Sequence, residues 1–209
     1  MNNDLKIENE LPVPGLYGLV VCGGKSSRMG MDKAMLDYYG KPQCYHVYEM
    51  MNVFCEKVFI SCNEQQAELI NNEYETLIDL PYYSDIGPMA GLLTALTGYS
   101  HKNILVIGCD YPFLKKDELA DFLPLCRHEN SAAAFYNKKE ELYEPLLAYY
   151  HHHAKTMLLE MFEAGQYSLQ HFLRTGNAFK YYPKNEKAIT SIDTMKDFIE
   201  TKQLITLSE

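Results

Sequence analysis

The sequence lacks long apolar runs. None of its 209 residues lies in a stretch that approaches the ~18 uninterrupted apolar residues needed to cross a bilayer. Residues 1–14 carry Asp4, Glu8 and Glu10 and have no apolar core, so they do not resemble a secretory signal peptide. We therefore expect a cytosolic protein without membrane contact, with residues 1–14 as an N-terminal extension and residues 15–209 as one domain.

Positive charge is also scarce. The chain has 19 Lys and Arg residues against 28 Asp and Glu residues, a formal net charge of −9. Nucleic-acid binding needs a clustered basic surface against the phosphate backbone, so the composition argues against a nucleic-acid partner. The composition does not exclude binding of a small anionic ligand, because a few basic side chains close together, backbone N–H groups or a bound cation can hold it.

The spacing of cysteines offers no metal or redox motif. None of the six cysteines falls in a C-x-x-C pair, and Cys22 and Cys109 sit in the apolar runs VVC and VIGC. In a chain without an export signal, such cysteines are best interpreted as reduced core residues.

Short apolar, β-branched runs alternate with helix-like segments in the first half of the chain. This alternation is typical of an α/β fold around a mainly parallel sheet. No repeat and no linker rich in Pro, Gly or Ser interrupts it, which favours one domain. Strands are predicted at residues 16–22, 57–62, 76–78 and 103–109, and helices at residues 43–55, 65–73 and 89–97.

The second half of the chain has a mixed pattern, which predicts late strands that are not all parallel. Strands are expected at residues 132–136, 146–150 and 179–182, and helices at residues 115–126, 154–164, 168–175 and 194–201.

The densest chemical signal follows the first predicted strand. Gly23 and Gly24 form a loop in which backbone N–H groups can approach phosphate oxygens, and a helix is expected to begin near Asp32. Lys25, Arg28 and Lys33 add three cations within nine residues. The spacing matches neither a P-loop nor G-x-G-x-x-G, so the segment predicts phosphate binding of another kind.

A second signal is Asp110, just past the strand at residues 103–109. Open α/β sheets place their ligands at the carboxyl ends of strands. Mg²⁺ is usually bound through one or two carboxylates together with substrate phosphates. Asp110 is therefore a candidate metal ligand.

The segment GGKSSRMGMDK resembles the signature of the molybdenum cofactor guanylyltransferases, within the wider NTP-transferase superfamily. The resemblance implies catalytic roles for Arg28 and Lys33 on the phosphates and for Asp110 on the metal. Where the family usually has L-A-G-G, this chain has Val21 and Cys22 before the glycines, a change of little consequence for backbone contacts. The implied nucleotide contacts in this loop are Val21, Cys22, Gly23, Gly24, Lys25 and Lys33.

Further matches lie between the loop and Asp110. The family has an asparagine in its nucleotide pocket where Asn63 stands, and a guanosine-binding aspartate at a spacing that fits Asp79, with Asp85 as an alternative. The segment GPMAG resembles a turn and helix start of the family, in which Gly87 and Gly91 let the base approach the backbone closely.

Two segments in the second half of the sequence bear on which acceptor receives the nucleotidyl group and on which nucleotide base the protein binds. YEPLLA, at residues 143–148, follows the guanylyltransferase layout, which generic sugar-phosphate nucleotidyltransferases lack. Asp193, in the segment SIDT, stands where many guanylyltransferases have asparagine, and it resembles the I-D-T of cytidylyl-transferring relatives. Asp193 is therefore a candidate second carboxylate for the metal.

The resemblance implies a single-domain, Rossmann-like three-layer sandwich of the nucleotide-diphospho-sugar transferase type. It implies Mg²⁺-dependent transfer of GMP from GTP to a molybdopterin-type cofactor, with release of pyrophosphate. The alternatives are a cytidylyltransferase of the same cofactor, a sugar-phosphate nucleotidyltransferase, or an inert GTP-binding regulator on the same fold. A monomer in transient contact with proteins of cofactor biosynthesis or with molybdoenzymes is the simplest expectation.

The run His151-His152-His153 invites interpretation as a metal site. Consecutive residues on a helix point about 100° apart, which makes ligation of one ion difficult. The run is therefore predicted to be a solvated helix start.

Overall fold

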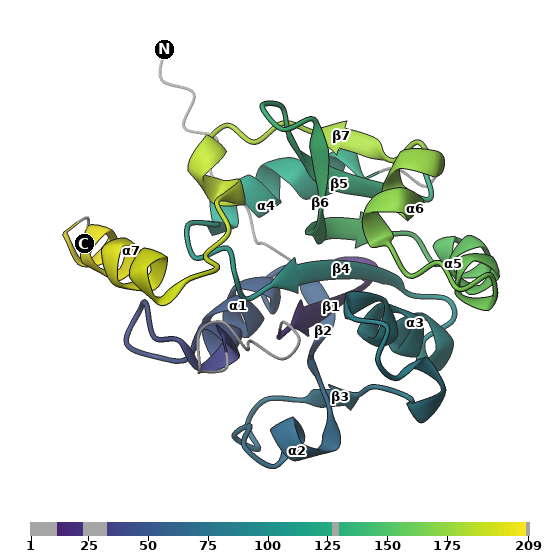
Figure 1. Ribbon diagram of the computed structural model, residues 1–209, viewed down its shortest axis with the longest axis horizontal. Helices are drawn as coiled ribbons and strands as arrows, with labels where there is room; N and C mark the ends of the chain where they lie inside the picture. The colour runs from purple at the N-terminus through teal and green to yellow at the C-terminus, as the bar shows by residue number, and fades with distance from the viewer. Residues whose placement is uncertain (1–11, 23–32, 127–129, 208–209) are drawn as a thin grey trace.

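The computed structural model describes residues 12–22, 33–126 and 130–207. Its centre is a seven-stranded sheet in the order β3-β2-β1-β4-β6-β5-β7, which runs from bottom to top in Figure 1. The strands are β1 (Val13–Val21), β2 (Cys55–Cys62), β3 (Thr76–Ile78), β4 (Asn103–Gly108), β5 (Ala132–Asn137), β6 (Leu142–Tyr150) and β7 (Phe179–Tyr181).

Six of the strands run in one direction, and β6 runs against them. β1 pairs in parallel with both β2 and β4, β2 with β3, and β5 with β7. β6 is antiparallel to both of its neighbours, β4 and β5. The expectation of a mainly parallel sheet with late mixed strands is confirmed.

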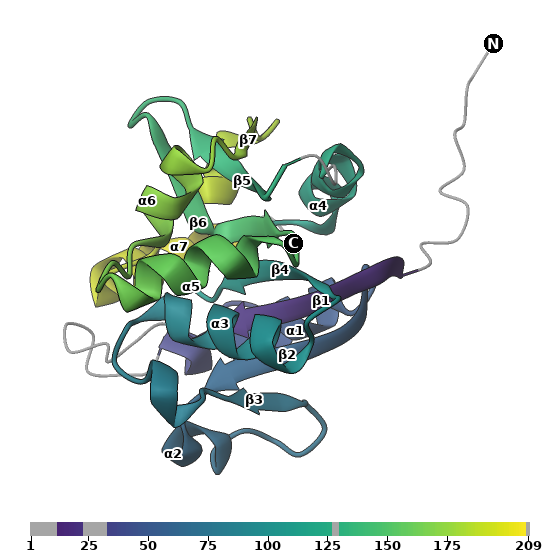
Figure 2. The ribbon, with the colours of Figure 1, turned by 90° about the vertical axis from the view of Figure 1, so that its right-hand side faces the viewer.

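Helices cover both faces of the sheet. The α-helices are α1 (Gln43–Met51), α2 (Glu64–Ala67), α3 (Pro88–Gly98), α4 (Lys116–Phe122), α5 (Ala154–Glu163), α6 (Leu169–Thr175) and α7 (Met195–Thr206). In Figure 1, α1 and α4 lie to the left of the strands, and α3, α5 and α6 lie to the right; Figure 2 shows the same layers turned by 90°. This is the three-layer arrangement expected from the sequence.

Successive side chains along a strand point to opposite faces of the sheet, and this alternation divides the core between the two layers of helices. In β1, Val20 packs with the cluster under α1 and α4, whereas its neighbours Leu19 and Val21 pack with the cluster under α3, α5 and α6. Because both faces are buried, the central strands are continuous apolar runs, which is why they were recognisable in the sequence.

A third, smaller core lies outside the sheet. Leu36 and Tyr38, which follow the 3₁₀ helix η1 (Lys33–Met35), pack with Ile192 and Ile205 from the region of α7. The rings of Tyr38 and Phe198 meet edge to face with centroids 5.0 Å apart. This cluster fixes the segment after Lys33 against the segment before α7.

Several predicted elements differ from the observed ones at their ends: the strand expected at residues 146–150 begins at Leu142, and the helix expected at residues 194–201 continues to Thr206. Three predicted helices differ further. The helix predicted at residues 43–55 ends at Met51, because Cys55 pairs with Val13 and begins β2. The helix predicted at residues 65–73 is reduced to the single turn α2, and Leu69, on its expected apolar face, is exposed. The helix expected near Asp32 is, over the described residues, the 3₁₀ turn η1.

The prediction for the histidine run was wrong on two points. His151 to His153 precede the first residue of α5, so the angular spacing of a helix does not apply to them. Moreover, His151 is buried, and only His153 is exposed. The main chain of the run is held in the turn that connects β6 to α5.

All six cysteines lie in the described part of the chain, and no two of them form a disulfide. Cys44, Cys55, Cys62 and Cys109 are buried, and the other two are half-buried. The interpretation of these residues as reduced core cysteines is confirmed for the four buried ones. Among the described residues, no helix is long and apolar enough to span a membrane.

Candidate active site

The polar residues selected from the sequence follow the ends of neighbouring strands. Cys22 follows β1, Asn63 follows β2, Asp79 follows β3, and Asp110 comes two residues after the end of β4. Since these four strands are parallel, their carboxyl ends meet at one edge of the sheet, where α/β proteins bind ligands. Val21, the last residue of β1, pairs with Ser61 on one side and Gly108 on the other.

Asp110 carries a carboxylate that is buried at this edge. Its Oδ1 atom accepts no hydrogen bond from any described residue. Burial raises the pKa of the Asp110 carboxyl above its ordinary value, while a hydrogen bond from its own backbone N–H and, to a smaller extent, the nearby Lys33 ammonium act in the opposite direction. Gly108 makes room for this oxygen, because a Cβ at position 108 would lie 2.5 Å from Asp110 Oδ1.

Lys33 and Asp193 form an ion pair beside Asp110. Lys33 Nζ donates to Asp193 Oδ1 at 2.6 Å, across 160 positions of sequence. The backbone carries the same connection, since the N–H of Ile192 donates to the Asp110 carbonyl at 2.9 Å. The structure therefore brings together three predicted site residues that the sequence places far apart.

Asp193 is in a different environment from Asp110. Its side chain is 62% exposed, against 16% for that of Lys33. Among the described residues, the hydrogen bond to its Oδ2 atom is a long one, 3.5 Å from Ser191 Oγ. Residues 190–192, before Asp193, have no regular structure, and the hydrogen bond from the Ile192 N–H to the Asp110 carbonyl holds this segment in place.

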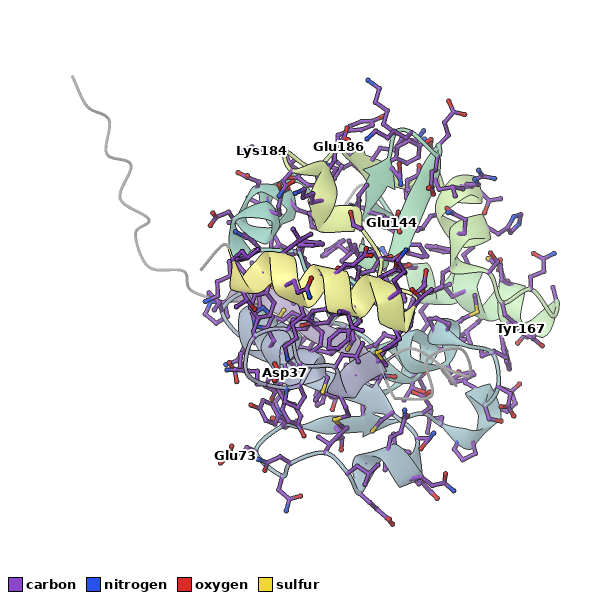
Figure 3. All side chains as sticks on the ribbon, turned by 60° about the vertical axis from the view of Figure 1, so that its left-hand side comes forward. Asp37, Glu73, Glu144, Tyr167, Lys184 and Glu186 are labelled. Atoms are coloured by element: carbon purple, nitrogen blue, oxygen red, sulfur yellow. The ribbon has the colours of Figure 1, made fainter. Side chains whose placement is uncertain are left out.

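Glu144 and Tyr111 extend this cluster and were not among the predicted site residues. Tyr111 Oη donates to Glu144 Oε2 at 2.8 Å. Burial raises the pKa of Glu144 to about 7; the hydrogen bond from Tyr111 opposes this rise, and the charge of Asp110 adds to it. In Figure 3, Glu144 and Asp37 lie on opposite sides of α7, which crosses the view in yellow.

The direction of β6 explains why Glu144 reaches this edge. Its antiparallel register pairs Leu147 with Ile107, so the amino end of β6 lies beside the carboxyl end of β4. The segment EPLLA was recognised in the sequence as a family element, and only the strand direction shows that its glutamate lies near Asp110.

A second buried oxygen without a partner lies near Asp110. Tyr38 Oη makes no hydrogen bond with any described residue. Burial raises the pKa of the Tyr38 phenol, and the Asp110 carboxylate adds to the effect. Both Tyr38 Oη and Asp110 Oδ1 can therefore accept a further hydrogen bond, and a carboxylate oxygen can also bind a cation.

Asp79 lies at the other side of the edge, beyond β1. Ser61 Oγ donates to Asp79 Oδ1 at 3.0 Å, and burial raises the pKa of this carboxyl. Gly91, in the second turn of α3, lies directly against this pair, because a Cβ there would collide with Ser61 Oγ. The glycine thus lets α3 pack closely on the carboxyl ends of β2 and β3.

Asn63 and Gly87 each begin a helix. Asn63 is the N-cap of α2, where its side chain accepts from the Gln66 N–H at 2.8 Å. Gly87 is the N-cap of α3 with φ +64°, a value that favours glycine. Gly23, Gly24, Lys25 and Arg28 lie outside the described residues, so their predicted contacts with phosphate stay predictions.

The described residues at this edge can hold an anionic ligand together with a divalent cation. Lys33 supplies a positive charge, and the partnerless oxygen of Asp110 supplies a hard donor of the kind that Mg²⁺ prefers. The site offers no Ser-His or Cys-His pair among its described residues, so its chemistry favours positioning and charge stabilisation over a covalent intermediate.

Comparison with known proteins identifies similar sequences. The model of the MobA-like NTP transferase domain matches residues 18–181. A molybdenum cofactor biosynthesis bifunctional protein of Synechocystis sp. is 37% identical over 58% of this chain and 35% of its own length. A molybdenum cofactor guanylyltransferase of Pseudomonas entomophila is 31% identical over 55% of this chain and 60% of its own length.

A solved structure is similar over nearly the whole fold. The molybdopterin-guanine dinucleotide biosynthesis protein A of Archaeoglobus fulgidus superposes with a TM-score of 0.75 at 25% identity, over 91% of this chain and 99% of that one. The alignment with the Synechocystis protein spans about one third of that protein, and the alignment with the Pseudomonas protein spans about three fifths of it. The structural match, in contrast, covers almost all of the Archaeoglobus protein.

Proposed function

The chain belongs to the family of MobA-like NTP transferase domains, and from this we propose that it transfers GMP from GTP to a molybdopterin-type cofactor and releases pyrophosphate. The observation that carries the proposal is the buried carboxylate oxygen of Asp110, which has no hydrogen-bond partner among the described residues and lies beside the Lys33–Asp193 ion pair. Relatives named as molybdenum cofactor guanylyltransferases, and the structural match to the Archaeoglobus protein, support the choice of nucleotide and acceptor.

The residues present fit a Mg²⁺ ion. Leaving a buried carboxylate oxygen without a partner costs stability, and a hard cation at that oxygen removes the cost. We infer that Asp110 holds the ion and that Asp193 is its second carboxylate. When bound, Mg²⁺ neutralises phosphate charge and helps to orient the reacting groups.

The other residues act through charge and position. Lys33 places its ammonium where phosphate oxygens accumulate negative charge as pyrophosphate departs. Gly23, Gly24, Lys25 and Arg28 belong to the same proposed phosphate site. The acceptor phosphate is itself an anionic nucleophile near neutral pH, so the chain need not supply a nucleophile or a general base.

The nucleotide pocket is proposed at the ends of β1 to β3. Val21 and Cys22 would contact the nucleotide through their backbone, and Asp79 would bind the guanine base, with Asn63, Gly87 and Gly91 nearby. The Asp79 carboxyl, which already accepts a bond from Ser61, retains an oxygen for N–H donors of a base. Two donors on the guanine edge suit one carboxylate.

A cytidylyltransferase is the second candidate, because Asp193 resembles the aspartate of cytidylyl-transferring relatives. A sugar-phosphate nucleotidyltransferase and an inert GTP-binding regulator fit less well. A sugar-phosphate nucleotidyltransferase would not account for the EPLLA segment, and an inert regulator would not account for the presence of both Lys33 and Asp110. A cytosolic monomer, in transient contact with proteins of cofactor biosynthesis or with molybdoenzymes, completes the proposal.

The choice of base is tested by comparing nucleotides. In the presence of Mg²⁺, GTP should raise the melting temperature of the protein more than the same concentration of CTP, ATP or UTP does, because a ligand that binds the folded state more tightly stabilises it more. With molybdopterin as acceptor, only GTP should yield pyrophosphate at a substantial rate. A larger shift and a faster reaction with CTP would assign the protein to the cytidylyltransferases.

The role of Asp193 is tested by a single substitution. If Asp193 is a second carboxylate ligand, Asp193→Asn should raise the Mg²⁺ concentration needed for half-maximal initial rate by about tenfold, because a hard cation loses a charged ligand. If Asp193 acts only on Lys33, the Mg²⁺ dependence should stay as in the wild type, and only the maximal rate should change. Titration of the initial rate with Mg²⁺ distinguishes the two outcomes.

A further inference from the structure

Three histidine rings gather in the turn between β6 and α5. The rings of His151, His152 and His153 have centroid separations of 4.2, 4.6 and 4.1 Å. One nitrogen from each ring lies within 4.8 Å of those of the other two. Small rotations of these side chains can bring three nitrogens around one ion, since Zn²⁺ binds histidine nitrogen at about 2.0–2.1 Å.

The turn lies at the other edge of the sheet from Asp110. β6 ends at Tyr150, which pairs with Ile104 near the start of β4 and with Ala132 at the start of β5. The cluster is thus separate from the proposed nucleotide site. In the part of the chain that the structure describes, it is the one group of three or more His, Cys, Asp or Glu residues with this geometry.

Asn103 determines which nitrogen of His152 can bind a metal. The backbone N–H of His152 donates to Asn103 Oδ1 at 3.0 Å, which identifies this atom as an oxygen acceptor. The same oxygen lies 3.2 Å from His152 Nδ1, so Nδ1 carries the proton and Nε2 carries the lone pair. A metal-binding histidine usually donates its second ring N–H to such a carbonyl group.

Main-chain hydrogen bonds also hold the turn. The His151 N–H donates to the Ser131 carbonyl at 3.0 Å, and the Ala154 N–H donates to the His151 carbonyl at 2.8 Å. His153 occupies the N-cap position of α5, but its side chain makes no capping hydrogen bond. Helix capping therefore does not account for a histidine at position 153.

Two features oppose an ion here, and both are weak. His151 Nδ1 accepts a bond of 3.3 Å from the His153 N–H, and ligation through either nitrogen of His151 would replace that long bond. The positive end of the α5 dipole also disfavours a cation, but this effect is small for a partly exposed site compared with coordination by three imidazoles.

We propose that His151, His152 and His153 form a binding site for a divalent transition-metal ion, of which Zn²⁺ fits best. Neutral imidazoles suit Zn²⁺, Cu²⁺ and Ni²⁺, and they suit Mg²⁺ poorly, so the site does not compete for the ion proposed at Asp110. Three protein ligands leave a fourth tetrahedral position. Either water or the ring of His101, whose centroid is 6.4 Å from that of His152, can take this position. The site is structural, linking the start of β4 to α5.

The test uses the whole chain, stripped of metal and kept in Mg²⁺-containing buffer. Titration with ZnCl₂ by calorimetry should show one tight site per chain, and Zn²⁺ should raise the melting temperature. His153→Gln, which changes an exposed side chain, should weaken Zn²⁺ binding by at least about tenfold. His152→Gln should do the same, and both variants should retain their nucleotidyl-transfer rate.

His171→Gln is the matched control, because His171 is also an exposed histidine near a helix start but stands outside the cluster. It should bind Zn²⁺ as the wild type does. Wild-type Zn²⁺ affinity in both His152→Gln and His153→Gln would place the ion elsewhere and overturn the proposal. Absence of a tight site in the wild type would overturn it as well.

Discussion

Asp110→Asn should reduce nucleotidyl transfer by about 10³-fold while leaving the protein at least as stable as the wild type. The loss follows because an amide oxygen is a much weaker ligand for Mg²⁺ than a carboxylate. The retained stability follows because Asp110 Oδ1 is buried without a partner among the described residues, so the substitution removes a buried charge. Pyrophosphate release and urea-induced unfolding, both without and with Mg²⁺, measure the two effects.

Asp117→Asn provides the control, since Asp117 is an exposed carboxylate in the first turn of α4. It should leave the transfer rate unchanged. Addition of Mg²⁺ and GTP should stabilise wild type and Asp117→Asn alike, and should stabilise Asp110→Asn much less. Normal transfer by Asp110→Asn would refute the assignment of this carboxylate to the metal.

Lys33→Ala should lower the rate by about 10²- to 10³-fold at saturating GTP, because the ammonium stabilises charge that develops as pyrophosphate leaves. The fold should persist, since the partner of Lys33 is the largely exposed Asp193, and exposed ion pairs contribute little to stability. The measurement is the maximal rate of pyrophosphate release, with the far-ultraviolet circular dichroism spectrum as a check on folding.

Lys41→Ala is a matched comparison. Lys41 also forms an ion pair of 2.6 Å, with Glu49 of α1, and this pair includes none of the proposed site residues. Loss of this pair should leave transfer intact. If Lys41→Ala and Lys33→Ala reduced the rate equally, the effect would come from general charge or stability, and the role of Lys33 at the phosphates would be refuted.

β4 could be predicted because it is buried on both faces, and it differs from the prediction only at its last residue. β3 is a partly exposed edge strand, and it lies where the sequence predicts it because a short apolar and β-branched run bounded by polar residues defines it. The short helix α2 could not be predicted in this way. Its sequence has helical periodicity, but Leu69 finds no surface to pack on, and periodicity alone does not stabilise a helix.

The candidate site was predictable only where its residues follow strands. Asp110 and Asp79 were found because each comes just after a strand of a parallel sheet. Glu144 was missed as a site residue because its position depends on the reversed direction of β6, which the apolar pattern does not show. The Lys33–Asp193 pair depends on the packing of α7 against residues 36–39, a contact between segments too distant for any local pattern to reveal.

The contacts of Asp193 and Ile192 also set an order of events in biosynthesis. The seven strands of the described chain lie between Val13 and Tyr181, so the ribosome has joined all of their residues before it adds Ile192 and Asp193. At about 5–20 residues per second, the delay between the last strand and Asp193 is on the order of one second. During that interval the Asp110 carbonyl lacks the N–H that it will accept, and Lys33 lacks its carboxylate. A nascent chain that already contains the residues of every described strand therefore still lacks the ion pair of its proposed phosphate site.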